Sequence, residues 1–394
     1  MKNYDVVVVG SGFCGAIISR QIAKELNKKV LLVERRNHIA GNMFDYKDEA
    51  GILLQKYGPH IFHTNKKDVY EYLTDIWDFE KYHLKCRVVM DGISTPSPFN
   101  FQTIDDFYEK NEATELKKRL SSYYSGMKKV TIVEMLKSED DIIREYAEML
   151  FEKDYKLYTS KQWGISPDEI DISVLSRVPV ILSYEDGYFD DLFQVMPKGG
   201  FTSLFDRILD EENIDIMLET DAMDFLELDK TNSQIYFKGC KKSVPVIYTG
   251  EIDRLFNYEY GELPYRSLRF EYKTYDIDSF QDAAVTAYPQ AEDYTRITEF
   301  KKLPHQNVAG KTTVAYEYPL KYKKNAKLEP YYPILTEDNT LLYNKYYELA
   351  TKFDNLFLCG RLADYKYYNM DDAISRALSV YEIIKISILK SGEL

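Results

Sequence analysis

The opening of the chain alternates between short hydrophobic runs and a longer segment with helical spacing. Residues 4–9 form a valine-rich run, and residues 30–33 form a second run that ends at Glu34. Between them, residues 16–26 place apolar side chains at helical intervals. Continuous hydrophobic runs of this length are typical of strands buried on both faces of a parallel sheet. The first thirty-five residues therefore predict a strand–helix–strand unit.

The hydrophobic period changes further along the chain. Residues 103–154 are polar, with apolar positions at helical spacing, which predicts a small helical insertion. Residues 268–272 and 312–318 alternate between apolar and polar side chains, which predicts antiparallel strands. Residues 356–360 indicate one more buried strand, and residues 371–389 have the period of an amphipathic helix.

The turn after the first strand carries a dinucleotide-binding fingerprint. Gly10 permits a tight turn, Gly12 lets the backbone approach a pyrophosphate, and Gly15 lets helix and strand pack closely. The helix N-terminus then offers its unpaired N–H groups to phosphates. Glu34, at the end of the second strand, is placed to accept hydrogen bonds from ribose hydroxyls.

The residues after Glu34 favour FAD over a nicotinamide dinucleotide. Glu34 is followed by Arg35 and Arg36 and then by Gly41 and Asn42. An extended loop with this Gly-Asn pair can run beside a flavin. The dinucleotide-binding fold opens the chain and is completed by a strand and a helix near its end. This layout suits a flavoprotein with an inserted substrate domain better than a nicotinamide dehydrogenase with two consecutive halves.

These patterns predict an α/β fold in which a Rossmann-like FAD-binding domain holds an inserted helical domain and an antiparallel β-sheet substrate domain. We expect the helical insertion at residues 102–155. The FAD-binding domain is discontinuous and is expected at residues 1–81, 198–256 and 351–394. The sheet domain is expected at residues 82–101, 156–197 and 257–350.

Composition excludes several classes of function. The net charge of −13 opposes non-specific binding to nucleic acid or to a membrane surface, so an anionic ligand requires a local cluster of arginines. The four cysteines are scattered, which predicts neither disulfides nor a metal site. No apolar run reaches the roughly 20 residues of a membrane span, and the first residues lack the pattern of a secretion signal. We expect a soluble, cytoplasmic protein.

Several segments together resemble the UDP-galactopyranose mutase family. The segment at 158–164 resembles the family's YTxKQWG, and the segment at 360–368 matches GRLAEYKYY at almost every position. Further matching segments lie at residues 56–65, 176–180, 188–189, 294–299, 317–319 and 331–333. They follow the family's order along the whole chain.

The resemblance implies a mutase that uses FAD without net redox change. In this family the flavin must be reduced, and its N5 attacks the anomeric carbon while the nucleotide leaves. The sugar ring then opens and recloses through a different hydroxyl, so that pyranose and furanose forms interconvert. The implied partners are a nucleotide-diphosphate sugar, foremost UDP-galactose, and a reductant such as NADPH, NADH or a flavin reductase. The product would supply furanose donors for bacterial surface polysaccharides such as a capsule, and a homodimer is possible.

The resemblance also implies roles for individual residues. The expected catalytic residues are Arg177, Arg296, His63, Arg361 and Tyr367. The expected FAD-binding residues are Gly10, Gly12, Phe13, Gly15, Glu34, Arg35, Gly41, Asn42, His60, Gly360, Arg361 and Met370. The expected substrate-binding residues are Tyr155, Tyr158, Thr159, Trp163, Arg177, Tyr188, Arg266, Arg296, Glu317, Tyr332, Tyr367 and Asn369. No metal ligands are expected.

Three positions depart from the family pattern and leave the sugar open. Pro96 and Ala287 replace asparagines, and Asn369 replaces an aspartate. We expect all three on the sugar side, where a lost hydrogen-bonding group changes which hydroxyls are recognised. Ordinary sequence drift within a galactose enzyme is the other interpretation of these departures. The alternative substrates for the same chemistry are UDP-arabinopyranose, UDP-N-acetylgalactosamine and dTDP-fucopyranose. An amine oxidase-like FAD oxidoreductase is a further alternative, which the number of arginines disfavours. A non-catalytic flavin- or nucleotide-sugar-binding module is less favoured still, since it does not explain the matching segments.

Overall fold

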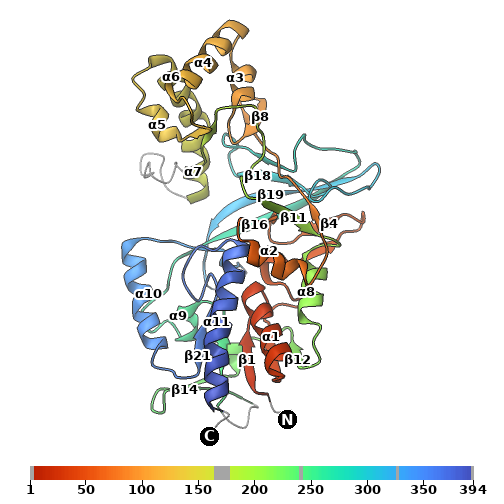
Figure 1. The fold of residues 1–394 in the computed structure, drawn as a ribbon, viewed down its shortest axis with the longest axis vertical. Helices are drawn as coiled ribbons and strands as arrows, with labels where there is room; N and C mark the ends of the chain where they lie inside the picture. The colour runs from red at the N-terminus through yellow and green to blue at the C-terminus, as the bar shows by residue number, and fades with distance from the viewer. Residues whose placement is uncertain (1–3, 164–177, 239–242, 325–327, 392–394) are drawn as a thin grey trace.

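A parallel five-stranded sheet lies in the lower half of the molecule (Figure 1). The computed structural model describes residues 4–163, 178–238, 243–324 and 328–391. From one edge to the other, the strands are β12 (Ile214–Met217), β2 (Val30–Val33), β1 (Val6–Val9), β15 (Val246–Tyr248) and β21 (Leu356–Leu358). Adjacent strands all run parallel. β1 is central because its valines are hydrophobic on both faces.

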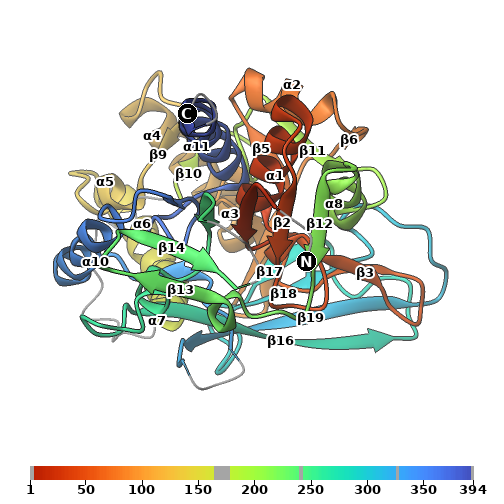
Figure 2. The same ribbon diagram turned by 90° about the horizontal axis from the view of Figure 1, so that it is seen from below.

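Helices and a hairpin cover the two faces of this sheet (Figure 2). On one face α1 (Phe13–Leu26) packs against α8 (Phe201–Leu209) and α11 (Met370–Ser391). The opposite face is covered by α9 (Ile252–Leu255), α10 (Glu337–Ala350) and the hairpin of β13 (Leu226–Asp229) and β14 (Gln234–Phe237). Alternate residues of the strands enter the two cores, as the period of a strand requires.

A second sheet of seven strands lies above the first. Its strand order is β20 (Tyr332–Pro333), β16 (Tyr265–Tyr275), β19 (Thr312–Lys321), β18 (Arg296–Glu299), β17 (Val285–Ala287), β7 (Cys86–Met90) and β8 (Ile93–Ser97). All neighbours are antiparallel except β17 and β7. The register places Arg296 opposite both Ala287 and Glu317, so these three residues share one face of the sheet.

A helical unit with its own core stands at the top of Figure 1, between β8 and α7. It contains α3 (Phe101–Phe107), α4 (Lys110–Tyr123), α5 (Ile132–Leu136) and α6 (Asp141–Leu150). A π-helical turn, η2 (Phe151–Tyr155), joins α6 to α7 (Lys156–Trp163), and β9 (Lys129–Val130) pairs with β10 (Val180–Ile181). The polar segment with helical spacing thus forms helices because its few apolar residues pack together.

Short strands join the two larger sheets. β11 (Phe193–Pro197) lies between β5 (Phe62–Thr64) and β6 (Phe79–Lys81), and so links two of the predicted domains. The remaining elements are α2 (Lys67–Thr74), the pair β3 (Asp45–Lys47) and β4 (Leu53–Gln55), and the 3-10 turns η1 (Gly41–Met43) and η5 (Ala222–Asp224). The domain boundaries themselves remain a proposal.

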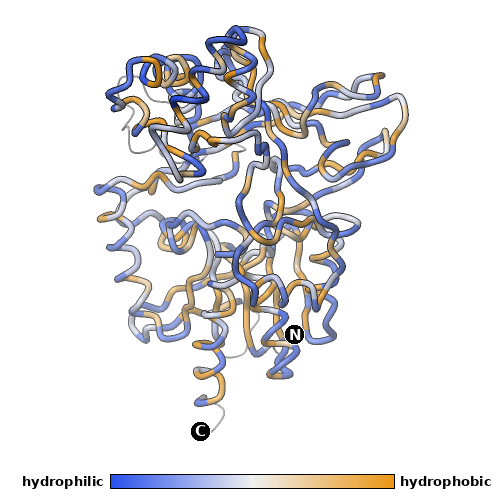
Figure 3. The backbone as a smooth tube through the Cα atoms, turned by 45° about the horizontal axis from the view of Figure 1, so that its top comes forward, coloured by the Kyte–Doolittle hydropathy of each residue, from blue (hydrophilic) through white to orange (hydrophobic). Residues whose placement is uncertain are grey.

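The α/β fold class predicted from the sequence is confirmed. Strand 30–33 has the expected bounds, whereas the first helix starts at Phe13, before the apolar pattern begins at residue 16. The glycine turn hides this start because Gly12 and Gly15 interrupt the hydrophobic period. Apolar and polar segments alternate along α11, which runs down past the sheet (Figure 3). Among the described residues, no helix has the length and hydrophobicity of a membrane span.

A substitution of Gly15 tests whether the close contact between α1 and β1 stabilises the core on the α1 face of the parallel sheet. A Cβ at this position would lie 1.9 Å from the carbonyl oxygen of Gly10, so strand and helix would have to separate. We expect Gly15→Ala to lower the free energy of unfolding by about 3 kcal/mol, as overpacking against backbone does. Gly12→Ala is the control, because its Cβ would meet no heavy atom closer than 4.0 Å. Equal stabilities of the two variants in urea would contradict the assignment.

Candidate functional site

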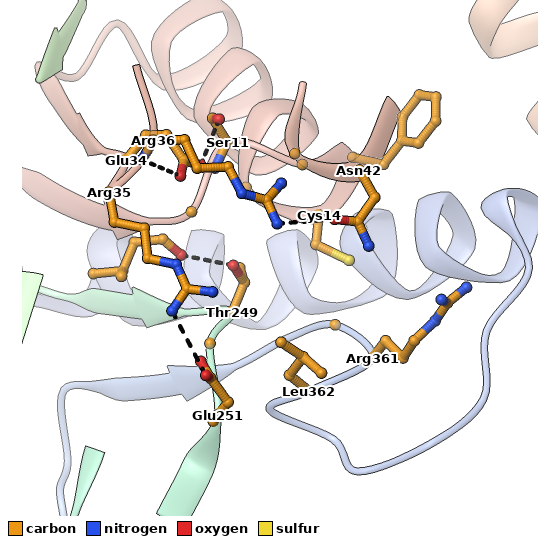
Figure 4. Close-up of a pocket in the computed structure, with 18 of the residues that line it drawn as sticks. Ser11, Cys14, Glu34, Arg35, Arg36, Asn42, Thr249, Glu251, Arg361 and Leu362 are labelled. Carbon is orange, nitrogen blue, oxygen red and sulfur yellow. Dashed lines mark hydrogen bonds and ion pairs between the residues drawn. The ribbon is translucent and has the colours of Figure 1, made fainter. Parts of the chain in front are cut away.

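A deep cavity opens at the carboxyl ends of the parallel strands (Figure 4). It encloses about 1240 Å³ of space, part of which is open to solvent. Residues that directly follow β1, β2 and β15 line it, together with the loop after β21 and the start of α11. Ligands of open α/β sheets bind at this edge, where loops diverge and helix N-termini converge. The cavity is therefore the candidate dinucleotide site.

Eleven of the twelve residues expected to bind the dinucleotide line this cavity. They are Gly10, Gly12, Phe13, Gly15, Glu34, Arg35, Gly41, Asn42, Gly360, Arg361 and Met370. His60 is the exception. Asn369, which was expected on the substrate side, also lines the cavity.

The turn after β1 has the geometry that close approach to a ligand requires. Gly10 has a φ of +96°, and a Cβ there would lie 2.1 Å from the hydroxyl oxygen of Thr249. Gly12 has open space where a Cβ would stand, so a ligand can approach its backbone. Glu34 is buried and accepts hydrogen bonds from the Ser11 N–H (3.0 Å), the Ser11 hydroxyl (2.7 Å) and the Arg36 N–H (2.9 Å). These bonds fix its carboxylate beside the turn and leave one of its roughly four lone pairs for a ribose hydroxyl.

An ion-pair network on the wall of the cavity was missed by the sequence analysis. Glu329 accepts from Arg35 at 2.6 Å and from Arg36 at 2.8 Å. Arg36 also donates to Asn42 at 3.0 Å and lies over the Tyr57 ring at 4.3 Å. Figure 4 shows both guanidinium groups at the cavity wall. No local motif marks Glu329, because it comes from a segment almost three hundred residues away from its partners.

The central ion pair of the seven-stranded sheet joins Arg296 and Glu317. The Arg296 Nε and Nη2 atoms each lie 2.8 Å from one oxygen of the Glu317 carboxylate, which is buried. Burial disfavours the charge of Arg296, but Glu317 outweighs it and raises the pKa of the guanidinium. The guanidinium therefore stays charged, and the N–H groups that do not face Glu317 are available to an anion.

A guanidinium–aromatic cluster connects the cavity with this sheet. Arg361 lines the cavity and lies over the rings of Tyr332 (4.8 Å) and Tyr367 (5.3 Å), which stack on each other. Its guanidinium donates to the backbone carbonyls of Tyr331 (3.2 Å) and Tyr368 (2.5 Å). Arg266 lies over the same Tyr332 ring at 5.3 Å. The structure thus brings together four predicted site residues from β16, β20 and the loop after β21.

His60 lies within electrostatic reach of Arg296 and Arg361. Its Nδ1 donates to the carbonyl of Gly58 at 2.8 Å in the neutral ring. Burial and these two arginines lower the pKa of His60 to about 4. At neutral pH the ring is therefore uncharged and adds no positive charge to the cluster.

His63 is held by an aspartate that the sequence analysis did not single out. Its Nδ1 lies 2.7 Å from Asp191 Oδ2, and its ring stacks on Phe189 with centroids 3.7 Å apart. The next residue, Thr64, donates to Asp371 at the start of α11. The residue after His63 is thus anchored to the helix whose first residue, Met370, lines the cavity.

The remaining predicted residues are distributed over α7 and the loop before β11. Tyr158 and Thr159 lie in α7, and Tyr158 is within electrostatic reach of Arg296. Tyr188, with 38% of its surface exposed, is similarly near Arg296 and Tyr367. Tyr155 instead donates to the carbonyl of Val178 from the core of the helical unit, so its position favours a structural role. Arg177 lies outside the described residues, as does the side chain of Trp163.

The three departures do not share one face of the sheet, and the expectation that all of them face the sugar stays a prediction. Pro96 stands opposite Arg87, whereas the neighbouring Thr95 stands opposite Val88 in the row of Ala287 and Arg296. Successive strand residues face opposite sides, so Pro96 points away from the Arg296 face. Asn369 lines the dinucleotide cavity rather than this sheet.

No group of metal-ligating side chains occurs in the parts of the chain that the structure describes. The fold and the cavity define a dinucleotide-binding protein of the Rossmann type, with a sheet beside the cavity that carries Arg266 and Arg296. In agreement, a family model for an NAD(P)-binding Rossmann-like domain matches residues 8–78. A second family model, for UDP-galactopyranose mutase, matches residues 153–367.

Full-length relatives agree with the family models. A probable UDP-galactopyranose mutase of Klebsiella pneumoniae is 34% identical and covers 100% of this chain and 98% of its own. A dTDP-fucopyranose mutase of Escherichia coli is also 34% identical, over 96% of this chain and 97% of its own. The crystal structure of a reduced UDP-galactopyranose mutase superimposes with a TM-score of 0.70 and 16% identity, over 98% of this chain and 95% of that one. The chain belongs to the UDP-galactopyranose mutase family.

The lowered pKa of His60 predicts a measurable dependence of stability on pH. The unfolded chain, with a histidine pKa near 6.5, takes up this proton before the folded protein does. The free energy of unfolding should therefore fall as the pH drops from about 6.5 to about 4. The fall is at most about 3 kcal/mol, and solvent that reaches the partly exposed ring reduces it.

Urea unfolding of wild type, His60→Gln and His83→Gln at several pH values measures this effect. The His60→Gln variant should lose less stability than wild type on acidification, whereas the exposed His83 serves as the control and should leave the slope unchanged. Identical slopes for all three proteins would contradict the assignment.

Proposed function

We propose that this protein is a reduced-FAD-dependent mutase that interconverts the pyranose and furanose forms of UDP-galactose. The observation that carries the proposal is the position of Arg361. It lines the dinucleotide cavity and at the same time contacts the rings of Tyr332 and Tyr367 beside Arg266. A bound flavin and a nucleotide sugar would therefore meet at this residue.

The residues of the cavity fit FAD. The Gly12 backbone is open to a pyrophosphate at the N-terminus of α1, and Glu34 is fixed where ribose hydroxyls are recognised. Gly41, Asn42, Gly360 and Met370 would line the flavin end. When bound and reduced, the flavin supplies the nucleophilic nitrogen for the anomeric carbon of the sugar.

The arginines would hold the departing diphosphate. A nucleotide that leaves the sugar must stay in place to attack it again, which requires permanently charged donors at fixed positions. Arg296 is oriented by Glu317, and Arg361 by two backbone carbonyls. Arg266 stands next to them, and Arg177 is assigned to the same role from its motif. Tyr158, Tyr188, Tyr332 and Tyr367 would add hydroxyl groups or ring surfaces.

The sugar itself is assigned through the family, with one alternative. Ala287 lies on the same sheet face as Arg296, where the family pattern has an asparagine. The similarity to a dTDP-fucopyranose mutase favours a deoxy sugar as the alternative substrate. UDP-arabinopyranose and UDP-N-acetylgalactosamine remain candidates with the same chemistry, whereas an oxidoreductase has no need for the arginines.

In the cell, the proposed reaction needs a reductant that keeps the flavin reduced, either a nicotinamide dinucleotide or a flavin reductase. The furanose product would be a donor for polysaccharide synthesis at a bacterial surface. We propose that the enzyme acts in the cytoplasm, as a monomer or a homodimer.

Turnover under controlled redox conditions tests the function. The purified protein is reduced with dithionite under anaerobic conditions and incubated with UDP-galactofuranose, and products are separated by anion-exchange chromatography. We expect conversion to the pyranose only when the protein is reduced, because the same nitrogen of the oxidised flavin is not nucleophilic. Conversion of dTDP-fucofuranose instead would move the assignment to the alternative sugar. No conversion of any nucleotide sugar by the reduced flavoprotein would overturn the proposal.

Removing one arginine tests the diphosphate site. Arg296→Ala should lower kcat/KM at least about 100-fold, as the loss of one oriented charged donor does, while flavin absorbance is retained. Arg269→Ala is the matched control, because Arg269 lies on the neighbouring strand pair over Tyr318, on the opposite sheet face. A normal kcat/KM for Arg296→Ala would contradict the role of this residue.

A further inference from the structure

We propose that Asp191 is a positioning residue that fixes the proton of His63 on Nδ1 and so leaves Nε2 as the proton acceptor of the site. The inference rests on the proposed function for its chemistry, but its geometry is independent of that function. It adds a residue for which the sequence analysis predicted no role.

The Asp191 carboxylate is held at both oxygens. Its Oδ2 lies 2.7 Å from His63 Nδ1, and its Oδ1 accepts from Asn65 Nδ2 at 2.8 Å. The amide oxygen of Asn65 in turn accepts from the Leu192 N–H at 2.8 Å. The carboxylate is thus locked to the strand that carries His63 and cannot turn away from the ring.

The imidazole ring is fixed from a second side. It stacks on Phe189 with an interplanar angle of 16°. Gln194, which pairs with His63 across β5 and β11, donates to the backbone carbonyls of Phe189 and Asp191 at 3.0 Å each. The loop that presents Asp191 and Phe189 is therefore tied to the sheet, and ring orientation and hydrogen bond support each other.

Residues next to the dyad in sequence connect it with the helix at the cavity and with the guanidinium–aromatic cluster. Thr64 donates to Asp371 in α11, whose first residue, Met370, lines the cavity. On the other side, Tyr188 directly precedes Phe189 and is within electrostatic reach of Arg296 and Tyr367. The charged groups nearest to the dyad along α11 are Asp371 and Asp372, both paired with Lys66.

The tautomer follows from the donor and acceptor inventory. An ionised carboxylate only accepts, so a neutral His63 must carry its proton on Nδ1. Within the described part of the chain, Nε2 makes no hydrogen bond, and the side chain keeps 17% of its surface exposed. Its lone pair is therefore free to accept a proton.

The proposed reaction has a step that needs such an acceptor. When the sugar ring recloses, the attacking hydroxyl forms a bond to carbon, and its O–H bond breaks. His63 Nε2 takes up that proton, and the Asp191 carboxylate stabilises the imidazolium that results. Ring opening breaks the bond between carbon and the original ring oxygen, and that oxygen must gain a proton. The His63 imidazolium donates this proton, and the imidazole takes one back from the attacking hydroxyl, so the protons balance over each turnover.

Histidine nitrogen NMR on the flavin-bound protein tests the tautomer directly. With ¹⁵N-labelled histidine, the ring signals of the five histidines are separated, and His63 is identified by its loss in His63→Gln. We expect a Nδ1–H tautomer in wild type and in Asp190→Asn. An Nε2–H tautomer for His63 in wild type would overturn the proposal, whether or not the enzyme turns over a nucleotide sugar.

Kinetics of Asp191→Asn test the consequence. An amide can donate to Nδ1 and so favours the other tautomer, and kcat should fall about 10- to 100-fold with KM for UDP-galactofuranose nearly unchanged. Asp191→Glu should recover part of the rate.

Two controls separate positioning from a structural effect. Asp190→Asn changes the adjacent aspartate, which pairs with Lys129 and has 74% of its side chain exposed, and should leave kcat unchanged. Asn65→Ala removes the other anchor but keeps the hydrogen bond between His63 and Asp191. It should retain the Nδ1–H tautomer of His63. A loss of rate in Asp191→Asn with that tautomer unchanged, or a change of tautomer in Asn65→Ala, would overturn the proposal. An inactive wild type with the expected tautomer would overturn the proposed function instead.

Discussion

The close backbone contact between the end of β1 and the start of α1 is the constraint on which the site depends. Gly15 sits against the carbonyl of Gly10, so the helix begins directly above the edge of the sheet. That contact places the helix N-terminus and the open backbone of Gly12 in the cavity. The loops after β2, β15 and β21 then converge on the same point, because parallel strands end at one edge.

Charge compensation explains how an acidic protein would present the proposed anion site. The net charge of −13 repels phosphates at long range, so the attraction must be local. Arg296 is oriented by the buried Glu317, and Arg35 and Arg36 share Glu329. Arg361 is held by uncharged backbone carbonyls and keeps its full charge for a ligand. The carboxylates hold the side chains in place without filling every donor, and this prior orientation is what diphosphate binding needs.

The two halves of the proposed site differ in composition. Backbone turns and one carboxylate, Glu34, lie in the dinucleotide cavity. The sheet above it carries guanidinium groups against tyrosine rings, and Arg361 contacts both halves. Sugar recognition would fall between these regions, where Ala287 shares a row with Arg296 while Pro96 faces away. A change of sugar would then involve position 287 and the start of α11 more than position 96.

The sequence by itself determined the strand–helix–strand opening, the glycine turn and eleven residues of the cavity, because each depends on neighbours within a few dozen positions. The motifs also identified Arg266, Tyr332, Arg361 and Tyr367, which the structure brings together. Only the tertiary structure decided which residues support them. Glu329 lies 293 positions from Arg36, and Asp191 lies 128 positions from His63. The direction of Pro96 likewise depends on strand register, which is set by pairing with Arg87 rather than by local sequence. Hydrogen bonds between such distant residues form only when packing brings their strands and loops together, so no local pattern records them.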